Sequence, residues 1–147
     1  GGGLELAISG DSKSGRIPAK FGVPEINLGM LPGFAIVRLQ QIIGMSKTKE
    51  MCMTGEPISA EEALRLNLVS KVVPPEKLMD EAMTMAGKIA EKPLLAILLA
   101  KSAVNRHIGG EEITYALDSM PFLFGTEDVR EGVTAFLEKR KPVFKDR

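Results

Sequence analysis

Two glutamates each follow a short segment of residues that restrict the backbone. This pair of carboxylates limits the possible folds and functions of the 147-residue chain more than any other feature. Glu5 follows the triplet Gly1–Gly3 at the start of an apolar helical pattern. Glycines there leave the first N–H groups of the helix unobstructed at its positive end, where a developing oxyanion is stabilised. Pro24 fixes its own φ and biases Val23 away from helix, so we expect Glu25 on a rigid bend. Two such carboxylates near one substrate can divide acid and base roles.

Composition narrows the class of protein. Lys plus Arg and Asp plus Glu both count 19, and this balance gives no case for binding nucleic acid or a membrane surface. No apolar run reaches membrane-spanning length. Cys52 is the only cysteine, so no internal disulfide can form and a reducing compartment is expected; the flanking methionines favour packing over a reactive thiol. His107 is the only histidine, and no residues have metal-ligand spacing, so no metal is expected.

Short elements separated by Gly and Pro are expected in the first half of the chain. Ser59 and Glu62 fit a capping box, in which the hydroxyl and the carboxylate each accept from a free N–H at the start of a helix that runs through Leu66. The polar run 12–16 is a poor buried strand. The remaining predicted elements are helices at Leu4–Ser9, Phe34–Ile43 and Ser46–Thr54 and strands at Lys20–Gly22 and Leu68–Val73.

Longer helices are expected from Pro74 onward. Pro93 suits a helix first turn, and the glycines at 109, 110 and 125 mark breaks. The predicted helices are Glu76–Lys92, Pro93–His107, Glu111–Met120 and Asp128–Lys139. We therefore divide the chain into 1–73, a mixed α/β core, and 74–147, a helical region.

Several ordered motifs resemble the enoyl-CoA hydratases of the crotonase superfamily, and the likeness covers essentially the whole chain. Asn67 stands where the family more often has glycine, and the glycine-rich stretch that usually follows Pro32-Gly33 is replaced by Phe34–Leu39. The matching segments are Gly1–Ala7, Asp11, Ala19–Gly29, Leu31–Gly33, Thr54–Ala63, Leu68–Pro74 and Phe136–Lys145. The resemblance implies an α/β fold whose core is the C-terminal part of the crotonase-type spiral, followed by helices that build oligomers and cover active sites.

The resemblance also implies a site. The Gly2 N–H matches one oxyanion donor, Glu5 the carboxylate that activates water, and Glu25 the one that supplies the α-proton. Lys139 resembles a family position that contacts the CoA phosphate. The alternative, to which we give equal weight, is that Lys139 is a solvated residue at a helix end. Taken without the family, Glu5 is a favourable acid in a helix first turn, and Glu25 a solvated loop residue.

The function expected by resemblance is hydration of a trans-2-enoyl-CoA to the 3-hydroxyacyl-CoA, with coenzyme A as part of the substrate and no separate cofactor. A homotrimer or a dimer of trimers, in the cytoplasm or the mitochondrial matrix, is expected. Family members carry a further N-terminal half with the second oxyanion donor, so we expect this chain alone to be inactive. Another crotonase reaction, such as isomerisation, and a noncatalytic binding or scaffold role remain alternatives.

Overall fold

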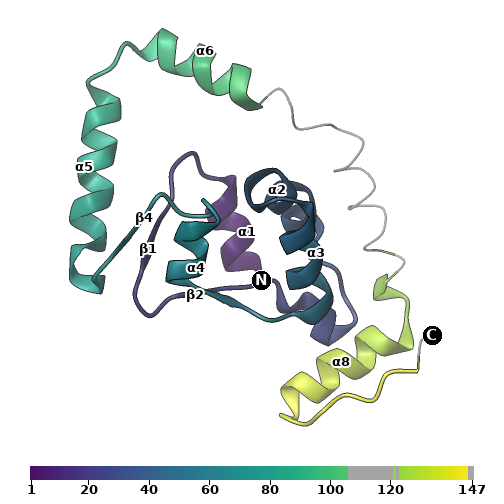
Figure 1. Ribbon diagram of the computed structural model, residues 1–147. Coiled ribbons are helices and arrows are strands. Elements are labelled where there is room, and N and C mark those ends of the chain that lie inside the picture. Colours follow the sequence, from purple (N-terminus) through teal and green to yellow (C-terminus); the bar gives the residue numbers. More distant parts are fainter. Residues whose placement is uncertain (106–120, 122, 146–147) are drawn as a thin grey trace.

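Short elements form the first half of the chain and longer helices form the second, within residues 1–105, 121 and 123–145, which the computed structural model describes (Figure 1). The first half contains α1 (Gly2–Ser9), β1 (Ser14–Arg16), β2 (Lys20–Phe21), the 3₁₀ helix η1 (Pro24–Leu28), α2 (Gly33–Ile43), α3 (Met45–Thr54), β3 (Ile58–Ser59), α4 (Ala60–Arg65) and β4 (Lys71–Val73). The second contains the 3₁₀ helix η2 (Pro75–Lys77), α5 (Leu78–Ala90), α6 (Leu94–Asn105) and α8 (Glu127–Leu137). For the described residues, these bounds confirm the expected helices and the short strand within a few residues.

Two small sheets join segments that are distant in sequence. β1 pairs in parallel with β4, with Ser14 opposite Lys71, and β2 pairs antiparallel with β3, with Lys20 opposite Ser59. Each pairing links residues before α2 to residues after α3. In sequence, the paired strands therefore flank α2 and α3, the two longest helices of the first half.

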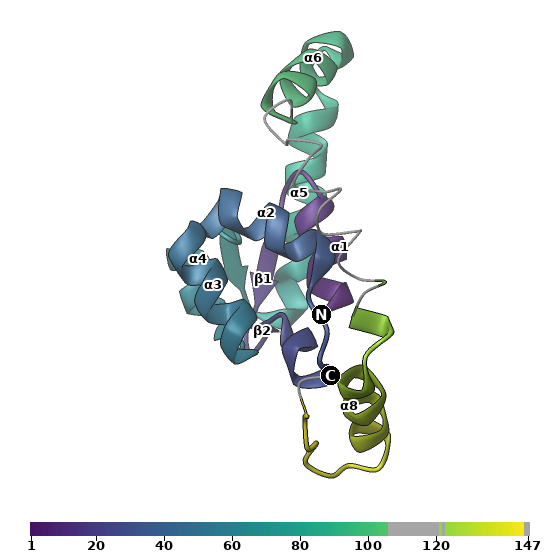
Figure 2. The same ribbon diagram turned by 90° about the vertical axis from the view of Figure 1, so that its right-hand side faces the viewer.

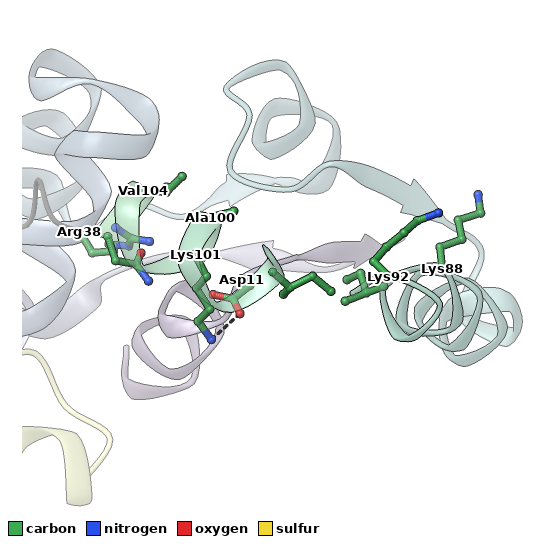
Figure 3. Close-up of a pocket in the computed structure, with 10 residues that line it drawn as sticks. Asp11, Arg38, Lys88, Lys92, Ala100, Lys101 and Val104 are labelled. Carbon is green, nitrogen blue, oxygen red and sulfur yellow. Dashed lines mark ion pairs between the residues drawn. The ribbon is translucent and has the colours of Figure 1, made fainter. Parts of the chain in front are cut away.

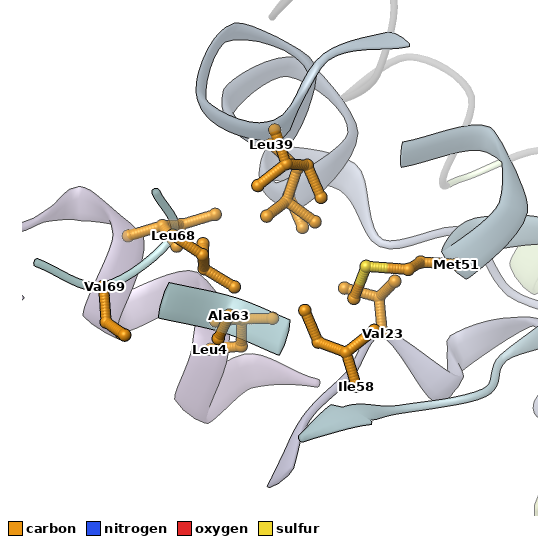
Figure 4. Packing of buried hydrophobic residues seen from close by; sticks show 11 residues of the cluster. Leu4, Val23, Leu39, Met51, Ile58, Ala63, Leu68 and Val69 are labelled. Carbon is orange, nitrogen blue, oxygen red and sulfur yellow. The ribbon is translucent and has the colours of Figure 1, made fainter. Parts of the chain in front are cut away.

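The core lies between α1, α2, α3 and α4 (Figure 4). Apolar residues recur at intervals of four, which places them on one face of a helix. Leu4 and Ile8 form such a pair on α1, and Ala35, Leu39 and Ile43 form a stripe on α2; all five are buried. This buried face holds the start of α1, where Glu5 lies, against the start of α2.

A short strand, β1, forms within the polar run 12–16, and only its middle residue is buried. Gly15 is the buried residue of the strand. A methyl group at this glycine would lie 3.3 Å from Phe21 Cζ and 3.6 Å from both Val69 Cγ2 and Val72 Cγ2. The side chains of Phe21, Val69 and Val72 therefore bury the middle of this strand, so its own residues need not be apolar.

The expected strand 68–73 is shorter than predicted, because Leu68 and Val69 complete the end of α4. The N–H groups of both residues bond the Ala63 carbonyl, at 2.8 and 3.3 Å, and the Asn67 N–H bonds Leu64 O at 3.0 Å. Asn67 has φ 59°, so this is a Schellman cap with asparagine in the left-handed position.

The capping box is half formed. The Glu62 N–H donates to the Ser59 hydroxyl at 3.2 Å, as expected. The Glu62 carboxylate instead accepts two bonds from Arg65, at 2.9 and 2.6 Å. The guanidinium competes successfully because it offers a charged, two-pronged donor one turn away.

The later helices lie outside the core, with α6 and α8 towards opposite ends of the molecule (Figure 2). Two ion pairs tie the first two of them to the core: Lys71–Glu81 at 2.5 Å and Lys101–Asp11 at 2.6 Å. No residue of α5 is fully buried. The expected helix 111–120 and His107 lie outside the described residues, and no helix within the described part is long and apolar enough to cross a membrane.

Candidate active site

Glu5 lies at the start of two helices. It occupies the first turn of α1, and its Oε1 accepts a hydrogen bond of 2.9 Å from the Ala35 N–H in the first turn of α2. Both helix ends favour a negative charge there. The stretch that departs from the family pattern after Pro32-Gly33 therefore holds this carboxylate in place.

The glycines before Glu5 present open backbone. Gly1 caps α1, and its carbonyl accepts from the N–H groups of Leu4 and Glu5 at 2.8 and 3.2 Å. The N–H groups of Gly2 and Gly3 lie in the first turn, where the helix itself offers no acceptor. A methyl group at either glycine would meet no atom within 4 Å. Gly2 and Gly3 are also exposed, so no side chain of their own covers this turn of the helix.

Glu25 lies on η1 beside the same helix end. Its side chain is 18% exposed, and Oε1 is 3.7 Å from the Gly1 nitrogen. That nitrogen also donates to the Gly22 carbonyl. Oε2 is buried and has no hydrogen-bond partner among the described residues. Because a buried polar atom without a partner is costly, Oε2 is an atom that a proton, a water or a substrate can satisfy.

The structure therefore brings Gly2, Glu5 and Glu25 to one place, the N-terminal turn of α1. Sequence reasoning missed the group that holds Glu5, the Ala35 N–H, although Pro32-Gly33 before an apolar helical run indicates a helix start. Within the described residues, no group of three or more His, Cys, Asp or Glu side chains could hold a metal ion.

Lys139 lies elsewhere, just beyond the C-terminal end of α8. Its φ is 54°, and its N–H bonds Phe136 O at 3.2 Å, while the Arg140 N–H bonds Ala135 O at 3.0 Å. This is a second Schellman cap, in which glycine is the usual left-handed residue. Lys139 is exposed.

A cavity of about 550 Å³ lies between α5, α6, Arg38 of α2 and the segment that follows α1 (Figure 3). Lys101 reaches across it to Asp11. Its lining consists of Asp11, Arg38, Lys88, Ile89, Lys92, Ile97, Ala100, Lys101, Val104 and Asn105. None of the residues expected at the site is among them, so this cavity is separate from the glutamate pair.

Known proteins share the sequence and the fold of this chain. The family model described as enoyl-CoA hydratase/isomerase matches residues 1–147. A protein of Syntrophomonas wolfei subsp. wolfei named crotonyl-CoA hydratase is 42% identical over 148 residues, which cover 98% of this chain and 57% of that protein. The chain thus spans little more than half the length of such relatives.

Solved structures extend the comparison. The crystal structure of carnitinyl-CoA hydratase from Mycobacterium avium matches with a TM-score of 0.93 and 32% identity, covering 100% of this chain and 59% of that one. The crystal structure of a methylmalonyl-CoA decarboxylase matches with a TM-score of 0.84 and 31% identity, covering 100% and 60%. These matches confirm the expected crotonase-type α/β fold and its helical C-terminal part. The chain belongs to the enoyl-CoA hydratase/isomerase family.

Proposed function

We propose that the protein carrying this chain hydrates a trans-2-enoyl-CoA to the 3-hydroxyacyl-CoA. The observation that carries the proposal is the buried Oε2 of Glu25, which has no hydrogen-bond partner in the described part of the chain. It lies beside the helix end that also presents Glu5 and the Gly2 N–H. The names of the relatives support a reaction on a CoA thioester.

The chemistry follows from the three groups. The Gly2 N–H, at the positive end of α1, stabilises the negative charge that develops on the thioester oxygen. Glu5, fixed by the Ala35 N–H, has a second oxygen with which to accept a proton as water adds to C3. Glu25, in its protonated form, delivers a proton to C2. The overall balance is one water added, and the two carboxylates are reset when the proton returns from Glu5 to Glu25.

The remaining parts of the proposal concern partners and place. Coenzyme A enters as part of the substrate and no separate cofactor is required. Lys139 binds its phosphate as a point charge. The complete protein forms a homotrimer or a dimer of trimers within the cell, in the cytoplasm or the mitochondrial matrix; a single cysteine fits a reducing compartment.

Product analysis tests the proposal. The complete protein is incubated with trans-2-enoyl-CoA and, separately, with 3-enoyl-CoA substrates, and the products are identified by mass spectrometry. A mass gain of one water from the 2-enoyl substrate is expected. A shifted double bond without water would favour isomerisation, and binding without any product would favour a noncatalytic role.

A further inference from the structure

The segment that carries Glu25 is held on one side by the core and by α3. Val23, just before η1, is fully buried. At the end of α3, Gly55 has φ +69°, and a methyl group there would lie 2.7 Å from Asn27 Nδ2 and 3.0 Å from Ile26 Cγ2. These contacts fix the start and middle of η1.

The other end of η1 rests on α8, and this contact is between backbones. Gly132 is a buried residue inside α8. A methyl group at Gly132 would lie 2.6 Å from the Leu28 carbonyl oxygen and 2.7 Å from its C and Cα atoms. Gly29, with φ +72°, packs in the same way, since a methyl group there would lie 3.2 Å from the Asp128 carbonyl carbon. The two segments are therefore as close as glycine permits.

We propose that Gly132 is a positioning residue for Glu25: close docking of α8 on Leu28 sets where η1 lies and so keeps the Glu25 carboxylate at the start of α1. The catalytic part of this inference rests on the proposed function, whereas the positional part does not. This inference gives α8 a role in the geometry of the site. That role is separate from the positive charge of Lys139, which lies just after the helix.

A glycine in the interior of a helix is less stable there than alanine, so its presence calls for a local reason. Gly87 inside α5 supplies the comparison, because a methyl group there would meet nothing within 4 Å. Gly87→Ala is therefore a matched control: the same chemical change in a helix, without the contact.

Cys52 on α3 reports the position of Glu25 without any assay of activity. Burial, and after it the negative charge of Glu25, raise the pKa of this thiol. The pH profile of alkylation by iodoacetamide, measured by mass spectrometry on the peptide that contains Cys52, gives the titration of this one group. Removal of the Glu25 charge lowers the pKa of Cys52, and so does movement of that charge away.

The experiment is a double-mutant cycle on the complete protein, with Glu25→Gln, Gly132→Ala and the double variant, in which alkylation is read at the peptide that contains Cys52. We expect each single change to lower the pKa of Cys52, and Gly132→Ala to add nothing once Glu25 is Gln. Gly87→Ala should leave the profile as in the unchanged chain. An equal effect of Gly132→Ala in both backgrounds would mean that it acts by loosening burial, and would overturn the proposal.

Kinetics of the complete protein supply the second readout. Gly132→Ala should lower kcat by about 100-fold, the scale expected for a 1 Å misplacement, with little change in KM. Gly87→Ala should change neither. An unchanged kcat for a folded Gly132→Ala protein would contradict the proposal, whereas absence of hydratase activity in the unchanged protein would contradict the proposed function and leave the thiol test valid.

A milder variant covers the case in which Gly132→Ala does not fold. Val129 is a buried residue of α8, and Val129→Ala weakens the docking of the helix without a clash. It should shift the Cys52 profile in the same direction by a smaller amount, again only when Glu25 is present. An unshifted profile in this folded variant would then decide against the proposal.

Discussion

Asn67 shows how one residue accommodates a backbone conformation that most side chains avoid. It takes the left-handed position after α4 with φ 59° and is exposed. Asparagine tolerates this region better than other non-glycine residues. The left-handed backbone at position 67 is therefore the cause of any preference there for asparagine or glycine.

Substitution of Asn67 tests that cause. Asn67→Ala should lower the free energy of unfolding by about 1 kcal/mol, because alanine lacks the local tolerance for φ > 0. Asn67→Gly should leave it unchanged or slightly higher. Urea denaturation of both variants measures the difference, and equal stabilities would show that the conformation at 67 carries no strain.

Glu5 and Glu25 could be found from sequence because each lies next to a local constraint, a glycine triplet and a Val-Pro bend. The atoms that complete their environment could not be found this way. The Ala35 N–H is 30 residues from Glu5, and the contact of Gly132 with Leu28 joins the two halves of the chain. Gly132 did leave a signal, a glycine inside a helical pattern, but its partner is set by tertiary packing.

At the scale of elements, helices were predictable and strand pairing was not. The stripe of Ala35, Leu39 and Ile43 has helical spacing that any local window contains. β1 forms from polar residues because β4 lies beside it, with Gly15 opposite Val72. The division of the chain after residue 73 stays a prediction.

The end of α8 is closed by a carboxylate that binds the following segment. Glu131 accepts from Arg140 Nη1 and Nη2 at 2.6 and 2.8 Å and from the Val143 N–H at 2.9 Å. The Arg140 bonds, followed by the Val143 bond, lower the pKa of Glu131 from 4.5 to about 2. A depressed folded-state pKa adds stability above the unfolded value, and this is lost as pH falls through the folded value.

Glu131→Gln should therefore lower the free energy of unfolding by its largest amount above pH 4.5. The difference from the unchanged chain should shrink as pH falls towards about 2. Because both side chains are partly exposed, the difference is modest and decreases with salt. Thermal unfolding of the two proteins from pH 2 to 6 measures it. A difference independent of pH would show that the charge of Glu131 is not what holds the segment.

Lys139 has a strained backbone conformation and a proposed role in binding. Two substitutions distinguish the effect of the strain from the effect of the charge. Lys139→Gly should raise stability by about 1 kcal/mol, because glycine suits the left-handed cap, whereas Lys139→Ala should not. Both substitutions should raise KM for enoyl-CoA and leave kcat little changed. The rise in KM should be smaller for pantetheine substrates and smaller at high salt. Equal losses with both substrate types would instead assign Lys139 to folding or assembly.

On the scale of the whole molecule, the later helices leave apolar surface uncovered in this chain. Met79, Met83 and Leu94 are 68%, 65% and 67% exposed. Leu98 follows Leu94 by one turn and is 51% exposed. We expect this surface to form an interface in the complete protein.

We expect the complete protein to be a homo-oligomer, a trimer by family resemblance, and Leu94→Glu with Leu98→Glu to disrupt it. Met53→Glu is the control, since Met53 is 73% exposed on α3, away from these helices. Light scattering at micromolar concentration gives the mass. A folded, unchanged protein that is monomeric would count against an interface there.

The central claim is that Glu5 and Glu25 act as a catalytic pair, and turnover of the complete protein carrying Glu25→Gln tests it most directly. Glutamine keeps the size of the side chain and removes proton transfer, so kcat for hydration of a trans-2-enoyl-CoA should fall by roughly 100- to 10,000-fold, as it should for Glu5→Gln. Affinity for a CoA ligand, measured by calorimetry on the same preparations, should change little. Turnover of Glu25→Gln close to that of the unchanged protein would show that the buried Oε2 takes no part in the reaction.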